Sequence, residues 1–181
     1  MVKEQVIKKH IKFDSDLEKF SNYLSNNIKN TNILVIGGAG TIGSSYIKQI
    51  LKYKPSKITV VDINENGLTE LTRDLRSSNL LDYNPEYITY PVNLLSNTFD
   101  KIFNSESWQV VANFSAHKHV RSEKDKISVE ALIKNNVYGA IKLLNLCEGN
   151  PPKYFFSVST DKAANPVNIM GASKSLMEKL I

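Results

Sequence analysis

The sequence predicts an α/β fold in which a doubly wound parallel sheet carries helices on both of its faces. Short apolar runs rich in β-branched and aromatic residues alternate with longer segments of helical periodicity. Strand and helix repeat five times, which favours parallel pairing because right-handed crossovers place successive helices against the sheet. With 181 residues, of which 41% are hydrophobic, the chain is long enough for a buried core.

Five apolar runs are predicted to be strands. Most are apolar at successive positions, as expected of strands that are covered on both sides. The predicted strands cover residues 32–38, 57–63, 86–92, 108–116 and 153–160.

Helical periodicity fills the intervals, with predicted helices at 41–53, 65–78, 95–104, 126–149 and 170–181. An amphipathic segment at 14–29 precedes the first strand and is interpreted as an appended helix. We therefore divide the chain into an N-terminal helix or linker, 1–30, and an α/β domain, 31–181. The last pattern ends at Ile181 without a cap, so we expect a domain that is truncated at its C-terminus.

Composition narrows the classes of partner and compartment. The net charge of +5 comes from lysines mixed with acids, which favours a solvated surface over a nucleic-acid groove. The single cysteine, Cys147, excludes an internal disulfide and is consistent with a reducing, cytoplasmic location. No signal-peptide pattern and no apolar stretch of membrane-spanning length occurs, so a soluble chain is expected.

A glycine-rich turn, "GGAGTIG", follows the first predicted strand and opens a helix. It places Gly37, Gly40 and Gly43 at G-x-x-G-x-x-G spacing. Small residues let the chain turn tightly, approach a pyrophosphate and pack the helix on the strand. The free N–H groups at the helix start, from Thr41 and Ile42 onward, suit an anion. A purely structural turn is the alternative.

Asp62 ends the second predicted strand, about twenty residues after the glycine turn. A carboxylate there accepts hydrogen bonds from both ribose hydroxyls of an adenosine and repels a 2'-phosphate. No arginine follows the strand directly, and Glu65 adds negative charge, so NAD is favoured over NADP. The alternative for Asp62 is a simple turn residue.

Five motifs in this order resemble the extended short-chain dehydrogenase/reductase superfamily. They are "GGAGTIG", "VVDINENGLTELTRDLRS", "FSAHKHVRSEKD", "NNVYGAIKLL" and "STDKAANPVNIMGASK". More narrowly, residues 31–181 are similar to the capsular-polysaccharide-biosynthesis branch of nucleotide-sugar 4,6-dehydratases. This resemblance implies a Rossmann-like fold, a tightly held NAD cofactor and UDP-N-acetylglucosamine as substrate.

The resemblance also implies a reaction. Hydride transfer to NAD oxidises the sugar 4-hydroxyl, water is lost across C5 and C6, and the hydride returns to C6 to leave a 4-keto-6-deoxy product. Such chemistry requires an acid for the 6-hydroxyl, a base for the C5 proton and polar contacts to the C4 oxygen.

Thr160, Asp161 and Lys162 follow the fifth predicted strand, beside the crevice where open α/β sheets bind ligands. By resemblance, Asp161 is the acid, Lys162 is the C5 base and Thr160 is a hydrogen-bonding partner of the C4 oxygen. From the residues alone, the alternative is a helix cap followed by an exposed lysine.

Lys174 matches the lysine of the superfamily's Tyr-x-x-x-Lys motif, which holds the nicotinamide ribose. The tyrosine position is Met170, whose thioether cannot donate or take up the proton. The large, often membrane-anchored members of the dehydratase branch resemble this chain in having methionine here. We therefore interpret Met170 as the mark of a subgroup, with an inactive site as the alternative.

The resemblance points to further residues of the site. Candidates for cofactor contacts are Asn93, Ser115, Ala116 and Asn136. Lys118 and His119 are candidates for substrate contacts, and His117 with His119 lacks the further ligands that a metal site requires.

Two other functions remain open at this point. One is a cofactor-binding module without turnover, because the family carries much of its sugar-nucleotide pocket beyond the last helix. The other is a nucleotide-sugar 4-epimerase, which Asp161 and Lys162 disfavour because epimerases need no acid for water loss. A homo-oligomer and a membrane-anchored full-length protein also remain open.

Overall fold

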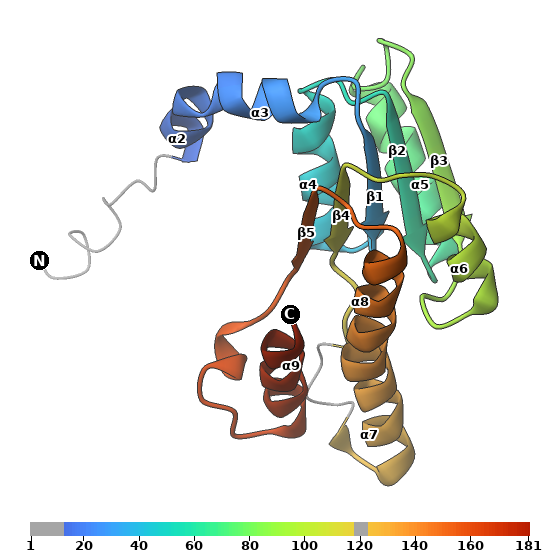
Figure 1. The fold of residues 1–181 in the computed structure, drawn as a ribbon, viewed down its shortest axis with the longest axis vertical. Helices are drawn as coiled ribbons and strands as arrows, with labels where there is room; N and C mark the ends of the chain where they lie inside the picture. Colours follow the sequence, from blue (N-terminus) through green and yellow to red (C-terminus); the bar gives the residue numbers. More distant parts are fainter. Residues whose placement is uncertain (1–12, 118–122) are drawn as a thin grey trace, which may run out of the picture.

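A five-stranded parallel sheet organises the computed structural model, which describes residues 13–117 and 123–181 (Figure 1). The strand order is β3-β2-β1-β4-β5, so the order reverses beside β1. Ile36 at the end of β1 is in register with Val61 of β2 and Asn113 of β4. The strands are β1 (Asn32–Ile36), β2 (Lys57–Asp62), β3 (Glu86–Pro91), β4 (Val110–Asn113) and β5 (Tyr154–Ser157).

The predicted helices after β1 are confirmed with small changes at their ends. They are α4 (Thr41–Leu51), α5 (Glu65–Ser77), α6 (Asn97–Asn104), α7 (Lys126–Ile133), α8 (Gly139–Gly149) and α9 (Ile169–Leu180). The predicted helix at 126–149 contains a π-helical turn, η2 (Lys134–Tyr138), between α7 and α8. A short 3₁₀ turn, η3 (Asp161–Ala163), follows β5.

Helices cover both faces of the sheet, as the sequence predicts. Neighbouring β1 residues Leu34 and Val35 are fully buried on opposite faces. Val35 packs in the cluster that includes α4 and α5, whereas Leu34 packs in the cluster that includes α6 and α8. The period-2 geometry of a strand therefore gives each face its own apolar core.

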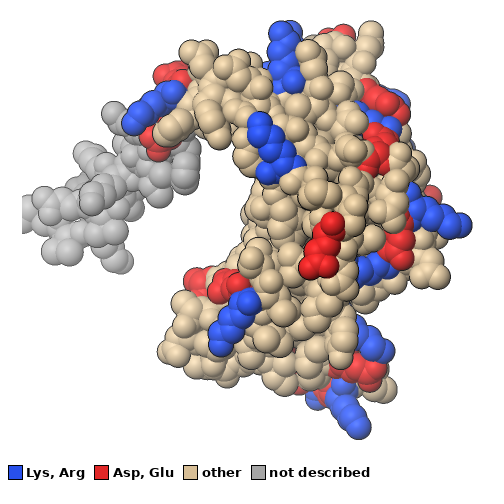
Figure 2. Space-filling model, in the orientation of Figure 1, with Lys and Arg blue, Asp and Glu red and all other residues tan. Residues whose placement is uncertain are grey.

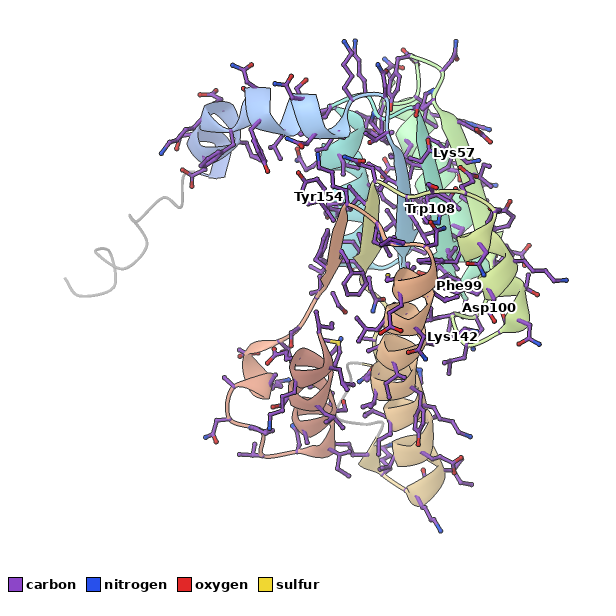
Figure 3. All side chains as sticks on the ribbon, viewed as in Figure 1. Lys57, Phe99, Asp100, Trp108, Lys142 and Tyr154 are labelled. Carbon is purple, nitrogen blue, oxygen red and sulfur yellow. The ribbon has the colours of Figure 1, made fainter. Side chains whose placement is uncertain are left out.

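Polar contacts join α6 and α8, the helices on the Leu34 face of the sheet (Figure 3). Lys142 of α8 forms a salt bridge with Asp100 of α6 at 2.6 Å, and its Nζ donates to the Ser96 carbonyl oxygen at 2.8 Å. Trp108 Nε1 donates to the Phe103 carbonyl oxygen at 2.8 Å. These bonds fix α6 beside α8 and beside the start of β4.

The strands β4 and β5 are shorter than the predicted ranges 108–116 and 153–160. Asn113 ends β4 because its side-chain Oδ1 accepts the Ser115 N–H at 3.0 Å, which turns the chain out of the ladder. Val158 N–H donates to the Asn113 carbonyl oxygen, and β5 has no β4 partner beyond it. Both strands therefore end close to the glycine turn, whose Gly37 lies against the backbone of Ser115.

The prediction of one helix at 14–29 is wrong, because the segment forms α2 (Phe13–Lys19) and α3 (Ser21–Ile28). Phe20 between them has φ −98° and ψ 5°, outside the helical region. Ile28 of α3 is buried in the core, and Asn27 Oδ1 accepts the Tyr154 hydroxyl at 2.8 Å. None of the helices in the described residues has the length and hydropathy of a membrane span.

Candidate functional site

A groove runs along the carboxyl ends of the strands and consists of two adjoining cavities of about 460 and 320 Å³. The first is lined by residues that follow β2 and β3, and the second by residues that follow β5. Both are lined by Gly37, Gly40, Phe114 and Ala116, so they adjoin each other at these residues. The groove therefore lies at the point where the strand order reverses.

The three glycines of the turn have different roles. Gly37 has φ +75°, and a Cβ there would lie 2.5 Å from the Ser115 nitrogen. A Cβ at Gly43 would lie 2.4 Å from the Gly37 carbonyl oxygen, so both positions exclude a side chain. Gly40 has no such conflict with the described residues: only the Gly37 oxygen lies nearby, at 3.4 Å. Its missing side chain instead leaves room in the groove.

The start of α4 differs from the other helices that flank the groove. No side chain in the described ranges caps α4 at Gly40, and Thr41, Ile42 and Gly43 line the second cavity. In α5, α6, α7 and α9, by contrast, a side-chain oxygen of the N-cap residue accepts a backbone N–H of the first turn. These N-cap residues are Asn64, Ser96, Asp125 and Asn168. The uncapped N–H groups of α4 are therefore available to an anion in the groove.

Asp62 lies where β2 ends and lines the first cavity. Its Oδ2 accepts the Ala39 N–H of the glycine turn at 2.9 Å, and its Oδ1 accepts the Asn64 N–H at 3.0 Å. Each carboxylate oxygen keeps a further lone pair for a ligand hydroxyl. Asp62 thus acts as a turn residue and remains suited to a ribose. Asn93 lines the same cavity.

Of the weaker candidates, Ser115 and Ala116 line the first cavity, whereas Asn136 lines neither. Asn136 is buried in the π-helical turn and bonds to both His117 backbone groups, accepting the N–H at 2.9 Å and donating to the carbonyl oxygen at 3.1 Å. It also donates to Ser173 Oγ at 3.0 Å. It therefore supports the wall behind the groove. Lys118 and His119 lie outside the described residues.

The structure brings three of the four predicted catalytic residues to the second cavity. Thr160, Lys162 and Lys174 line it together with Met170. Asp161 is exposed beside them, and the Thr160 hydroxyl donates to Asp161 Oδ1 at 2.9 Å. A hydroxyl at the cavity is thereby joined to a carboxylate.

Lys174 is only 5% exposed, yet it lines the cavity opposite the glycine turn. Its Nζ donates to the Val158 carbonyl oxygen at 2.9 Å and lies 3.5 Å from Met177 Sδ. Burial lowers the pKa of Lys174 to about 8, against the opposing charge of Glu178. The amine is buried but retains a donor for a ligand in the cavity.

Two residues of the site were missed in the sequence. The Ser159 hydroxyl is buried, finds no hydrogen-bond partner among the described residues, and belongs to a residue that lines the second cavity. Glu123 accepts the Met170 N–H at 2.8 Å and so caps the start of α9. Ser159 is detectable as a hydroxyl next to Thr160, but no local pattern links Glu123 to Met170.

The groove fits a dinucleotide. The open space at Gly40 and the uncapped start of α4 suit a pyrophosphate, and the Ser159 hydroxyl lacks a partner of its own. Together with the strand order, these features define a Rossmann-like fold. The chain belongs to the polysaccharide biosynthesis protein family, whose model matches residues 33–181.

Comparison with known proteins gives relatives of greater length. The chain is 35% identical over 157 residues to an uncharacterised membrane protein of Methanocaldococcus jannaschii, with 87% of this chain and 44% of that protein covered. It is 33% identical over 153 residues to a UDP-N-acetylglucosamine 4,6-dehydratase (inverting) of Campylobacter jejuni, with 82% and 42% covered. The chain thus spans less than half the length of these relatives.

A solved structure shares the fold. The enzyme WbmF of Bordetella bronchiseptica in complex with NADH matches with a TM-score of 0.67 at 17% identity. The match covers 86% of this chain and 45% of that one.

Proposed function

We propose that the chain is the cofactor-binding and catalytic portion of an NAD-dependent nucleotide-sugar 4,6-dehydratase that acts on UDP-N-acetylglucosamine in polysaccharide or glycan biosynthesis. The observation that carries this proposal is the Thr160–Asp161 hydrogen bond at a cavity that also contains Lys162 and Lys174. Family membership and the Campylobacter jejuni relative support the kind of reaction.

We assign NAD to the whole groove. Asp62 accepts from the adenosine ribose, the N–H groups of Thr41 and Ile42 bind the pyrophosphate, and Lys174 donates to the nicotinamide ribose. NAD bound there would supply the acceptor for the C4 hydride and the donor of the hydride that C6 receives. The NADH in the WbmF structure supports this choice of cofactor.

The chain's own residues move the protons. Met170 carries no titratable group, so Thr160 takes the proton of the sugar 4-hydroxyl while its own proton passes to Asp161 along the existing hydrogen bond. Asp161 then gives this proton to the departing 6-hydroxyl. The proton removed at O4 therefore leaves in the water molecule, and the carboxylate is restored.

Lys162 completes the proton transfers. It takes the C5 proton during water loss and returns it to C5 when C6 is reduced. Lys162 and Asp161 are both exposed, so the sugar must cover them when it binds. The match spans only 42% of the dehydratase relative, and we assign this covering and the grip on the nucleotide to a part of the protein that the matched stretch does not include.

The test uses the protein expressed from its complete reading frame with UDP-N-acetylglucosamine. We expect mass spectrometry to detect a product lighter by one water. A product of unchanged mass would instead identify an epimerase. Binding of NAD without conversion would identify a cofactor-binding module.

A further inference from the structure

Gly171 in the first turn of α9 lies unusually close to the backbone of the proposed catalytic segment. A Cβ at this position would lie 2.5 Å from the Lys162 carbonyl oxygen and 3.2 Å from its carbonyl carbon. Gly171 has ordinary helical geometry, so its backbone does not require glycine. Glycine is present here because α9 packs directly against the peptide group of Lys162.

The start of α9 is held at this distance by bonds on either side of Gly171. Glu123 accepts the Met170 N–H at 2.8 Å, and Asn168 Oδ1 accepts the Gly171 N–H at 2.7 Å. One turn later, Lys174 Nζ donates to the Val158 carbonyl oxygen at 2.9 Å. The bonds to Glu123 and Val158 join α9 to other segments and so oppose a movement of the helix away from Lys162.

This contact sets the spacing of the two walls of the second cavity. Thr160 and Lys162 come from the segment after β5, whereas Met170 and Lys174 come from α9. We propose that Gly171 is a positioning residue, whose missing side chain fixes Lys162, and with it Thr160, at the working distance from α9. In its catalytic consequence, this inference rests on the proposed dehydratase function.

Gly171→Ala tests the inference directly, and Gly149→Ala is a matched control. Gly149 is also a helical glycine, but a Cβ there meets no atom of the described residues within 4 Å. The readout is the peptide group of Lys162 itself. Lys162–Ala163 is the only Lys-Ala step in the sequence, so ¹³C-carbonyl lysine with ¹⁵N-alanine gives one resonance in a carbonyl-to-amide NMR experiment.

We expect this resonance to shift in Gly171→Ala and to keep its place in Gly149→Ala. An unchanged resonance in a folded Gly171→Ala protein would overturn the inference, whatever the reaction is. In the enzyme from the complete reading frame, we expect kcat to fall roughly a hundredfold while KM and NAD affinity stay near those of the unsubstituted enzyme. An undiminished kcat would overturn the catalytic consequence.

The two proposals fail separately. Absence of water loss in the unsubstituted enzyme refutes the dehydratase function but leaves the NMR result to decide on Gly171. Where Gly171→Ala does not fold, Glu123→Ala removes the neighbouring bond, and Glu123→Gln keeps an acceptor for the Met170 N–H. The Lys162–Ala163 resonance should shift in Glu123→Ala and stay in Glu123→Gln. A resonance that stays in both variants counts against the inference.

Discussion

The Lys174 side chain of α9 donates a 2.9 Å hydrogen bond to the carbonyl oxygen of Val158, just beyond the end of β5. This bond joins the helix that carries Met170 to the segment that carries Thr160, Asp161 and Lys162. It also holds a buried amine in the lining of the second cavity, where burial lowers the pKa of the amine.

The free energy of unfolding should depend on pH through Lys174. Its pKa is about 8 in the folded chain and 10.5 ordinarily, so the unfolded state binds more protons between these values. Stability from this group therefore rises with pH across that window, at up to about 1.4 kcal/mol per pH unit. Urea unfolding of the wild type and of Lys174→Met at pH 7 and pH 9.5 measures the effect. An equal pH dependence in both proteins would contradict it.

Asp62 should set both cofactor preference and the stability of the glycine turn. Calorimetry should show tighter binding of NAD than of NADP, because the carboxylate repels a 2'-phosphate. Asp62→Asn places an amide donor against the N–H of Ala39 or Asn64, so we expect a loss of about 1–3 kcal/mol of stability and weaker NAD binding. Glu18→Gln, at an exposed acid of α2 that does not line the groove, is the control. Tighter binding of NADP would refute the role of Asp62.

Removal of the Asp161 acid should stop water loss without loss of the cofactor. Asp161→Asn keeps the size of the side chain, and Asp161 does not line the groove, so NAD affinity should be unchanged. Thr160→Val removes the hydroxyl that bonds to Asp161 and should lower kcat about 10²- to 10⁴-fold. Product formation is followed by mass spectrometry. Normal turnover by Asp161→Asn would remove it from the mechanism.

Met170 should be replaceable by another apolar residue. It is 3% exposed and lines the second cavity, and the proposed proton path does not use its thioether. Met170→Leu should therefore cost less than about 1.5 kcal/mol of stability and leave kcat within a few-fold of wild type. A large loss of kcat in a folded Met170→Leu enzyme would show that the thioether takes part.

The bond between Asn27 of α3 and Tyr154 of β5 should stabilise the docking of the N-terminal helices. Asn27→Ala and Tyr154→Phe should each lower the free energy of unfolding by about 1 kcal/mol. The double variant should lose less than the sum, because each single change already breaks the bond. Urea unfolding of the four proteins gives the coupling. Strict additivity would show that the bond contributes nothing.

The order of strands and helices could be predicted from the sequence because each element has its own local pattern. Apolar β-branched runs marked the sheet, and the glycine turn placed the groove beside β1. The ends of β4 and β5 could not be predicted, because they depend on a side-chain bond of Asn113 and on the neighbouring strand. The break at Phe20 was likewise invisible, since the apolar spacing of 14–29 continues through it.

The site was predictable where the chemistry lies in one short motif. Thr160, Lys162 and Lys174 were named from such motifs and do line one cavity. The contact between Gly171 and Lys162 joins two segments by backbone packing alone. Such packing produces no hydrophobic periodicity or charge pattern in the sequence. The same is true of the Glu123 cap on α9.

On the face shown in Figure 2, no patch of one charge among the described residues offers a binding site for a large charged partner. Basic and acidic side chains are mixed over that face, which is hollowed below the N-terminal helices.

The strand order has a consequence for the order in which the groove is made during synthesis. Residues 32–93 contain β1, β2, β3, the glycine turn, Asp62 and Asn93, so one wall of the first cavity is synthesised before β4, whose following residues Ser115 and Ala116 line the same cavity. The second cavity depends on α9, which follows β5 in the sequence. Asp62 and the glycine turn are thus synthesised well before Lys174, and the two cavities of the groove are completed at different times.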